Sequence, residues 1–84
     1  MKLQNEKVRS EKLYRVGYMP DVDKYVMACV VPWVAWYDRY YEITEEEYNA
    51  FGSETSDKLA AEFNAKGTKS DRFFFSDKKE ENKS

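Results

Sequence analysis

Two carboxylates on one segment and a single thiol are the side chains in this sequence best suited to catalysis. Asp38 and Glu42 lie in a stretch typical of a β-strand, where residues an even number apart share a face. Paired carboxylates can serve glycoside hydrolysis, but 84 residues offer no loops to build a pocket around them. Cys29 lies in an apolar run, which favours a small buried residue over a nucleophile. We therefore expect no catalytic residue and no enzyme.

The composition excludes several further kinds of chemistry. There is no His, which excludes His-based acid–base catalysis and His metal ligands. One Cys cannot form an internal disulfide or a Cys-rich zinc site, and three Gly leave no Gly-rich phosphate loop. We expect no metal and no cofactor. No run is long and apolar enough for a membrane span, which favours a cytoplasmic protein.

The pattern of elements predicts an α+β fold: a small antiparallel sheet of three to four strands with one helix, or a broken helix pair, on one face. Expected strands cover residues 12–19, 25–31, 33–43 and 72–75, and expected helices cover 45–51 and 55–66. Residues 1–10 are read as either a frayed end or a short edge strand. Residues 1–76 would form the single domain, and the charged residues 77–84 a disordered tail.

The ends of the expected helices carry recognisable capping residues. Thr44 and Glu47 form the pattern of a capping box, in which each side chain bonds the other residue's backbone N–H. Ser53 is suited to cap a second helix, and Gly67 to end it.

The stretch 33–43 is rich in aromatic residues on both alternating faces. If it forms one strand, one set of side chains faces the core: Trp33, Ala35, Tyr37, Arg39, Tyr41 and Ile43. The other set would then be exposed: Val34, Trp36, Asp38, Tyr40 and Glu42. We expect Trp33 to fill the core and Trp36 to be a candidate interface anchor.

Charge is distributed unevenly along the chain, whose net value is −2. Residues 21–57 contain nine acidic and two basic side chains, together with most of the Trp and Tyr. This acidic, aromatic segment argues against nucleic-acid binding, which needs basic residues, and favours a basic protein partner. The partner-binding residues predicted here are Trp36, Tyr37, Asp38, Tyr40, Tyr41, Glu42, Glu45, Glu46 and Glu47.

One layer of helices can cover only one face of the expected sheet. Residues 25–31 are nevertheless apolar on both faces. The second face therefore needs a cover, since large apolar patches are rare on monomers. A second copy of the chain, a protein partner and the N-terminal segment are all candidates.

The run from Val34 to Tyr48, followed by Phe51, resembles the strand-into-helix segment of small immunity proteins that neutralise bacterial polymorphic or contact-dependent toxins. A later helix around Leu59 and the strand 72–75 fit the same outline. The resemblance implies a cytoplasmic protein that binds a toxin domain, often a nuclease, and blocks its active site or substrate entry. The alternative is a small self-associating structural or regulatory protein whose aromatic sheet face forms a homodimer.

Overall fold

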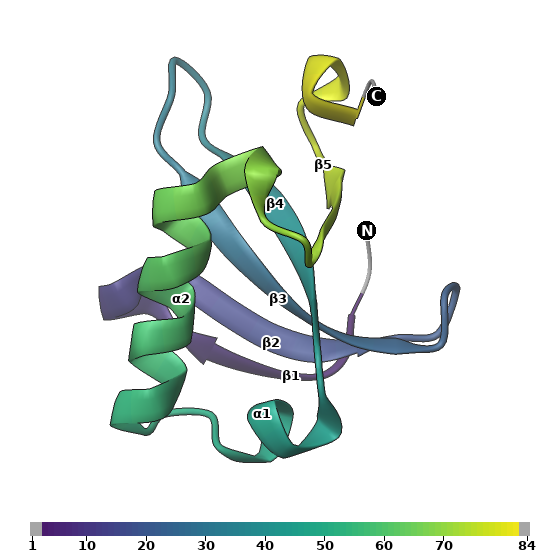
Figure 1. The fold of residues 1–84 in the computed structure, drawn as a ribbon, viewed down its shortest axis with the longest axis vertical. Helices are drawn as coiled ribbons and strands as arrows, with labels where there is room; N and C mark the ends of the chain where they lie inside the picture. Colours follow the sequence, from purple (N-terminus) through teal and green to yellow (C-terminus); the bar gives the residue numbers. More distant parts are fainter. Residues whose placement is uncertain (1–2, 83–84) are drawn as a thin grey trace.

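The chain folds into a five-stranded antiparallel sheet with two helices on one face. The computed structural model describes residues 3–82. The strands follow one another across the sheet in chain order (Figure 1). They are β1 (Gln4–Arg9), β2 (Tyr14–Met19), β3 (Lys24–Val31), β4 (Tyr37–Ile43) and β5 (Phe73–Ser76). The predicted α+β class is confirmed, with one strand more than the three to four expected.

Both helices lie between β4 and β5 in the chain and pack on the same side of the sheet. They are α1 (Glu45–Asn49) and α2 (Glu54–Lys66), and short 3₁₀ turns occupy Ser10–Lys12, Gly67–Lys69 and Lys79–Asn82. Thr44 and Glu47 form the predicted capping box, Ser53 caps α2, and Gly67 ends it with a positive φ. Within residues 3–82 no helix is long and apolar enough to cross a membrane.

The fifth strand is β1, which sequence reasoning left open as a frayed end or an edge strand. Its polar residues are held by contacts with both helices. Arg9 forms an ion pair with Asp57 of α2, at 2.9 Å between Nε and Oδ1, and the Tyr14 hydroxyl donates to the same carboxylate at 2.7 Å. The hydroxyl of Tyr48 in α1 donates to the carbonyl oxygen of Asn5. These side-chain contacts stabilise a strand with little apolar surface of its own.

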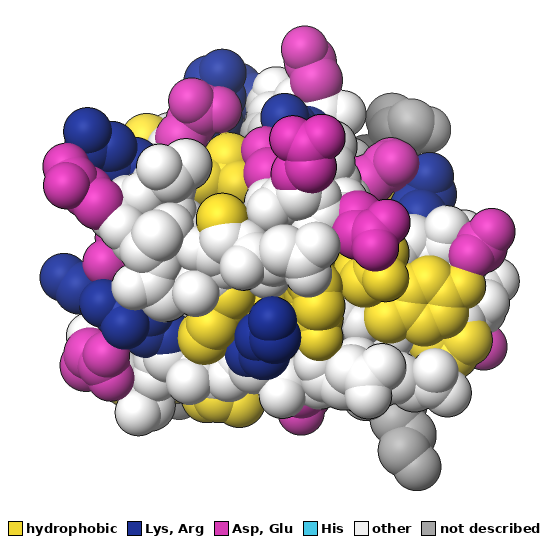
Figure 2. All heavy atoms as spheres, turned by 90° about the horizontal axis from the view of Figure 1, so that it is seen from below, with side chains coloured by type: hydrophobic (Ala, Val, Ile, Leu, Met, Phe, Trp, Pro, Cys, Tyr) yellow, Lys and Arg dark blue, Asp and Glu magenta, His cyan; other side chains and the backbone are white. Residues whose placement is uncertain are grey.

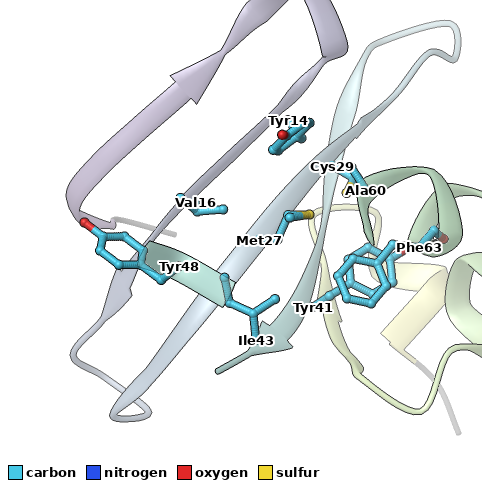
Figure 3. Close-up of a cluster of buried hydrophobic side chains, with 9 residues drawn as sticks. All are labelled: Tyr14, Val16, Met27, Cys29, Tyr41, Ile43, Tyr48, Ala60 and Phe63. Atoms are coloured by element: carbon cyan, nitrogen blue, oxygen red, sulfur yellow. Dashed lines mark hydrogen bonds between the residues drawn. The ribbon is translucent and has the colours of Figure 1, made fainter. Parts of the chain in front are cut away.

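The main core lies between the sheet and the two helices. Figure 3 shows its members converging from β2, β3, β4, α1 and α2. The rings of Tyr41 and Phe63 are stacked with centroids 4.3 Å apart. The remaining buried members are Tyr14, Val16, Met27, Cys29, Ile43, Tyr48 and Ala60.

A second, smaller core lies on the sheet face away from the helices, which we call the second face. Leu3, Met19, Val26, Ala28 and Tyr40 are buried there, with Phe74 and Phe75 packed against them. The pairing of β4 with β5 shifts register between Tyr40 and Tyr41. Phe74 and Phe75 consequently both contact the second core, although they are adjacent in sequence.

The structure corrects the expected orientation of residues 33–43. Tyr41 and Ile43 face the main core as predicted, but Tyr40 is only 1% exposed because the second face has a core of its own. Residues 33–36 are not part of the strand; they form the turn of the β3–β4 hairpin. Trp33 is 61% exposed, so the expectation that it fills the core is wrong.

The predicted disordered tail also differs from the structure, in residues 77–82. Lys79–Asn82 form a 3₁₀ turn that folds back against β4 and β5. Glu81 binds Arg39 of β4 through two hydrogen bonds, at 2.6 and 2.9 Å, because this half-buried guanidinium requires a carboxylate partner. Residues 83–84 lie outside the described residues.

Candidate protein-binding surface

The tip of the β3–β4 hairpin carries the most exposed group of large hydrophobic side chains in residues 3–82. Trp33, Val34 and Trp36 are 61%, 97% and 64% exposed. Pro32, which cannot donate a ladder hydrogen bond, follows β3 directly and precedes these residues. In Figure 1 this hairpin projects at the upper left, beyond the body of the sheet.

The base of the tip is held firmly on one side. Tyr37 donates a hydrogen bond to Glu81 at 2.7 Å, next to the Arg39–Glu81 ion pair. The bonds from Arg39 lower the pKa of Glu81 to about 2, so this carboxylate is charged at neutral pH. The ammonium of Lys78 lies 4.5 Å from the Trp33 ring centre, within range of a cation–π contact. The tip is therefore attached to an ordered base.

The acidic residues of the same sequence segment lie at the opposite end of the sheet. Tyr25 pairs with Ile43, which places the β2–β3 turn beside the start of α1. Phe73 pairs with Tyr41, which brings Asp71 to that end as well. The side chains gathered there and exposed are Asp21, Asp23, Glu42, Glu45, Glu46 and Asp71. We call them the acidic end.

Figure 2 views the molecule from below, the side on which α1 lies in Figure 1. Acidic side chains spread across much of this face, with basic ones among them and hydrophobic ones showing between. An open hollow of about 330 Å³ at the acidic end is lined by Glu42, Ile43, Thr44, Asp71 and Arg72. Sequence reasoning predicted a single acidic and aromatic surface, but the structure has two surfaces. The length of β4 separates the hairpin tip, which carries both Trp residues, from the acidic end.

The structure places the nine predicted binding residues in four different settings. Trp36 is exposed on the tip, and Glu45 and Glu46 are exposed at the acidic end. Tyr40 and Tyr41 are buried, at 1% and 0% exposure, so the prediction that they contact a partner is contradicted. Burial raises the pKa of each to about 12.

The other four predicted residues are engaged within the chain. Tyr37 is half-buried, and its hydroxyl donates a hydrogen bond to Glu81. Asp38 forms an ion pair with Arg15, at 2.8 Å between Oδ2 and Nη1. Exposed Glu42 binds Lys24 at 3.0 Å. Burial opposes ionisation of Glu47, but bonds from the Thr44 backbone N–H and from Arg72 lower its pKa overall.

The two carboxylates considered for catalysis are not placed as a pair. Asp38 and Glu42 are four positions apart in an extended strand, a span of about 13 Å, which is longer than the carboxylate separation that glycoside hydrolysis uses. Each also has its own cationic partner, Arg15 and Lys24 respectively. Within residues 3–82 no cluster of three His, Cys, Asp or Glu residues could hold a metal ion.

Sequence reasoning missed Trp33 as a surface residue, whereas Val34 was expected on the exposed face and is 97% exposed. The available signal was Pro32, which ends a fully apolar strand and opens a short link to the next one. Comparison of the chain with protein-family models, with curated proteins and with solved structures found no match.

Proposed function

We propose that this protein is a non-enzymatic binding protein of the immunity type, which binds and neutralises a toxin domain in the cytoplasm. The observation that carries the proposal is the exposure of Trp33, Val34 and Trp36 together on one hairpin tip. Both Trp residues of the chain are on this tip. Trp is strongly enriched among the residues that dominate binding energy at protein interfaces.

An ordered base favours tight binding through this tip. The contacts of Tyr37, Arg39 and Lys78 hold the hairpin before a partner arrives. A pre-ordered binding element loses less conformational entropy on association, so more of the contact energy appears as affinity. A partner pocket that receives Trp33 or Trp36 would bury the exposed part of that side chain, 61% of Trp33 or 64% of Trp36.

The acidic end supports a cationic toxin as the partner. Among the residues of this end, Glu45 and Glu46 form no ion pair with a described residue. Unpaired surface charge steers an oppositely charged partner and speeds association, an effect that salt screens. Nucleases are one class of cationic toxin, and the resemblance of residues 34–51 to immunity proteins points in the same direction.

Protection in cells tests this function directly. The chain is co-expressed with the C-terminal domain of the protein encoded by the gene immediately upstream of its own, and growth is measured. Wild type should restore growth, and the double variant Trp33→Ala, Trp36→Ala should not. Val22→Ala, an exposed apolar residue in the β2–β3 turn, is the matched control and should protect fully. Full protection by the double variant, or none by wild type, would contradict the proposal.

A further inference from the structure

The side chain of Asn82 bonds β5 as a neighbouring strand would. Its oxygen accepts from the Ser76 N–H at 2.7 Å, and its nitrogen donates to the Ser76 carbonyl at 2.8 Å. Ser76 pairs with Arg39 of β4. The N–H of Asp77, next in the chain, donates to the carbonyl of Asp38. In an antiparallel ladder such a bond flanks the pair, so the N–H and carbonyl of Ser76 point away from β4, and Asn82 occupies the outer edge.

The hydroxyl of Ser76 is also bonded by residues 77–82, which we call the C-terminal segment. It donates to Glu81 at 2.8 Å and accepts from the Lys78 N–H at 3.0 Å. The same Glu81 carboxylate accepts from Tyr37 once and from Arg39 twice. Every polar group of Ser76 is thus engaged by the C-terminal segment, which follows directly on β5 (Figure 1).

The strand under this cover is strongly apolar. Three of the four residues of β5 are consecutive phenylalanines, at positions 73–75, and all three are half-buried. The strand contains no charged residue and no Pro. An uncharged segment of high β-propensity pairs readily with another strand when the N–H and carbonyl groups of its edge are free. A cover over these groups therefore opposes self-association.

The opposite edge of the sheet, β1, has protection of its own. It carries the charged side chains of Glu6, Lys7 and Arg9. Its pairing with β2 shifts register between Gln4 and Lys7, and Asn5 in this stretch has a φ of 52°. Charged side chains and an irregular backbone both oppose the addition of a further strand. Of the two edges, β5 is therefore the one that depends on another segment for its cover.

We propose that the C-terminal segment is a guard that keeps the chain monomeric by occupying the β5 edge, and that a second copy pairs there, β5 against β5, once the segment is released. Release leaves the N–H and carbonyl of Ser76 without partners. Two identical edges can pair antiparallel about a two-fold axis, each giving the other the same bonds. The occupant is a second copy because the matching uncharged, Phe-rich edge is the same segment in another chain.

The C-terminal segment can be released without disturbing either core. Its 3₁₀ turn, Lys79–Asn82, contains no buried residue, and neither core includes a residue of the segment. Its hold on β5 consists of the polar contacts of Lys78, Glu81 and Asn82 with Ser76. Substitution of Glu81 and Asn82 therefore loosens the segment while the sheet and helices keep their packing.

The test compares wild type with a released variant that combines Glu81→Gln and Asn82→Ala. Light scattering measures the mass of each full chain up to the high micromolar range. Wild type should give the 10.0 kDa of one chain throughout. The released variant should give twice that mass, with a dimer dissociation constant at least about 10-fold below that of wild type. Lys79→Ala with Glu80→Gln, which changes two exposed residues of the same turn, is the matched control and should stay monomeric.

Amide hydrogen exchange at Ser76 identifies the edge involved. In wild type this N–H should exchange slowly at every concentration, because Asn82 accepts its hydrogen bond. Asn82→Ala alone leaves the contacts of Glu81 in place and should keep the fold, yet speed the exchange at Ser76 at least about 10-fold. In the released variant the exchange should be fast when dilute and slow again in the dimer, where β5 of the second copy accepts the bond.

Circular dichroism establishes that each variant is folded. A wild type that dimerises, a released variant that stays monomeric, or a dimer in which Ser76 still exchanges fast would overturn the inference. So would an Asn82→Ala variant in which Ser76 exchanges as slowly as in wild type. These measurements use no toxin or other partner, so a failure of the inference is distinct from a failure of the proposed function.

Discussion

Leu3 lies directly over Gly17. A β-carbon added to Gly17 would be 2.8 Å from Cβ of Leu3 and 3.1 Å from the carbonyl oxygen of Gln4. The N-terminal segment crosses β2 at this point and covers part of the second face, where Met19 and Val26 are fully buried. The close approach accounts for a Gly in the middle of a strand, a position that normally weakens a sheet.

Gly17→Ala should lower the free energy of unfolding by about 1–3 kcal/mol, because the added methyl forces the N-terminal segment away from the sheet. Chemical denaturation measures the loss. Leu3→Ala should also destabilise, but the double variant should lose less than the sum of the two, since removing the Leu3 side chain makes room for the new methyl. Strictly additive losses would show that Leu3 does not pack on Gly17.

Glu81→Gln should lower the melting temperature at pH 7 and remove part of the acid sensitivity of the fold. Bonds from Arg39 hold the pKa of Glu81 at about 2, below its ordinary value of 4.5. A carboxylate with a lowered folded-state pKa stabilises above pH 4.5, and this contribution is lost as the pH falls towards 2.

The gap in melting temperature between wild type and Glu81→Gln should therefore close between about pH 4.5 and 2. Glu47 and Asp57 also have lowered pKa values, so the difference between the two proteins, not the wild-type curve alone, isolates Glu81. Glu80→Gln, at the exposed neighbouring residue, is the matched control and should follow wild type. A gap that does not change with pH would rule out the ion pair as its cause.

The thiol of Cys29 should be unreactive in the folded protein. It is fully buried, and burial raises its pKa from 9.0 to about 12. A thiol-specific reagent at pH 8 should label the native chain only as fast as it unfolds, and label it at once in denaturant. Rapid stoichiometric labelling of the native chain would contradict the burial and would reopen a chemical role for Cys29.

Local signals predicted much of the fold. The Thr44–Glu47 capping box fixes the start of α1 through contacts only three residues apart, and Gly67 ends α2 through its own backbone freedom. Such features can be identified from the sequence because the interacting groups are neighbours in the chain.

Long-range contacts account for what the sequence did not reveal. Arg39 and Glu81 are 42 residues apart, and only the folded chain shows that this pair holds residues 77–82 against the sheet. The burial of Tyr40 depends on Phe75 and Leu3, which reach the second face from the two ends of the chain. The candidate site was partly predicted: Trp36 was identified as an anchor and Val34 was expected to be exposed, but Trp33 was expected in the core and lies instead in the exposed turn of the hairpin.

Titration calorimetry of the purified chain with the toxin domain encoded beside its gene tests the central claim most directly. Trp36→Ala should weaken binding about 30-fold or more, as expected when a residue that dominates an interface is truncated. Val22→Ala should bind as wild type does. A Trp36→Ala variant that binds as tightly as wild type would show that the hairpin tip is not the binding surface.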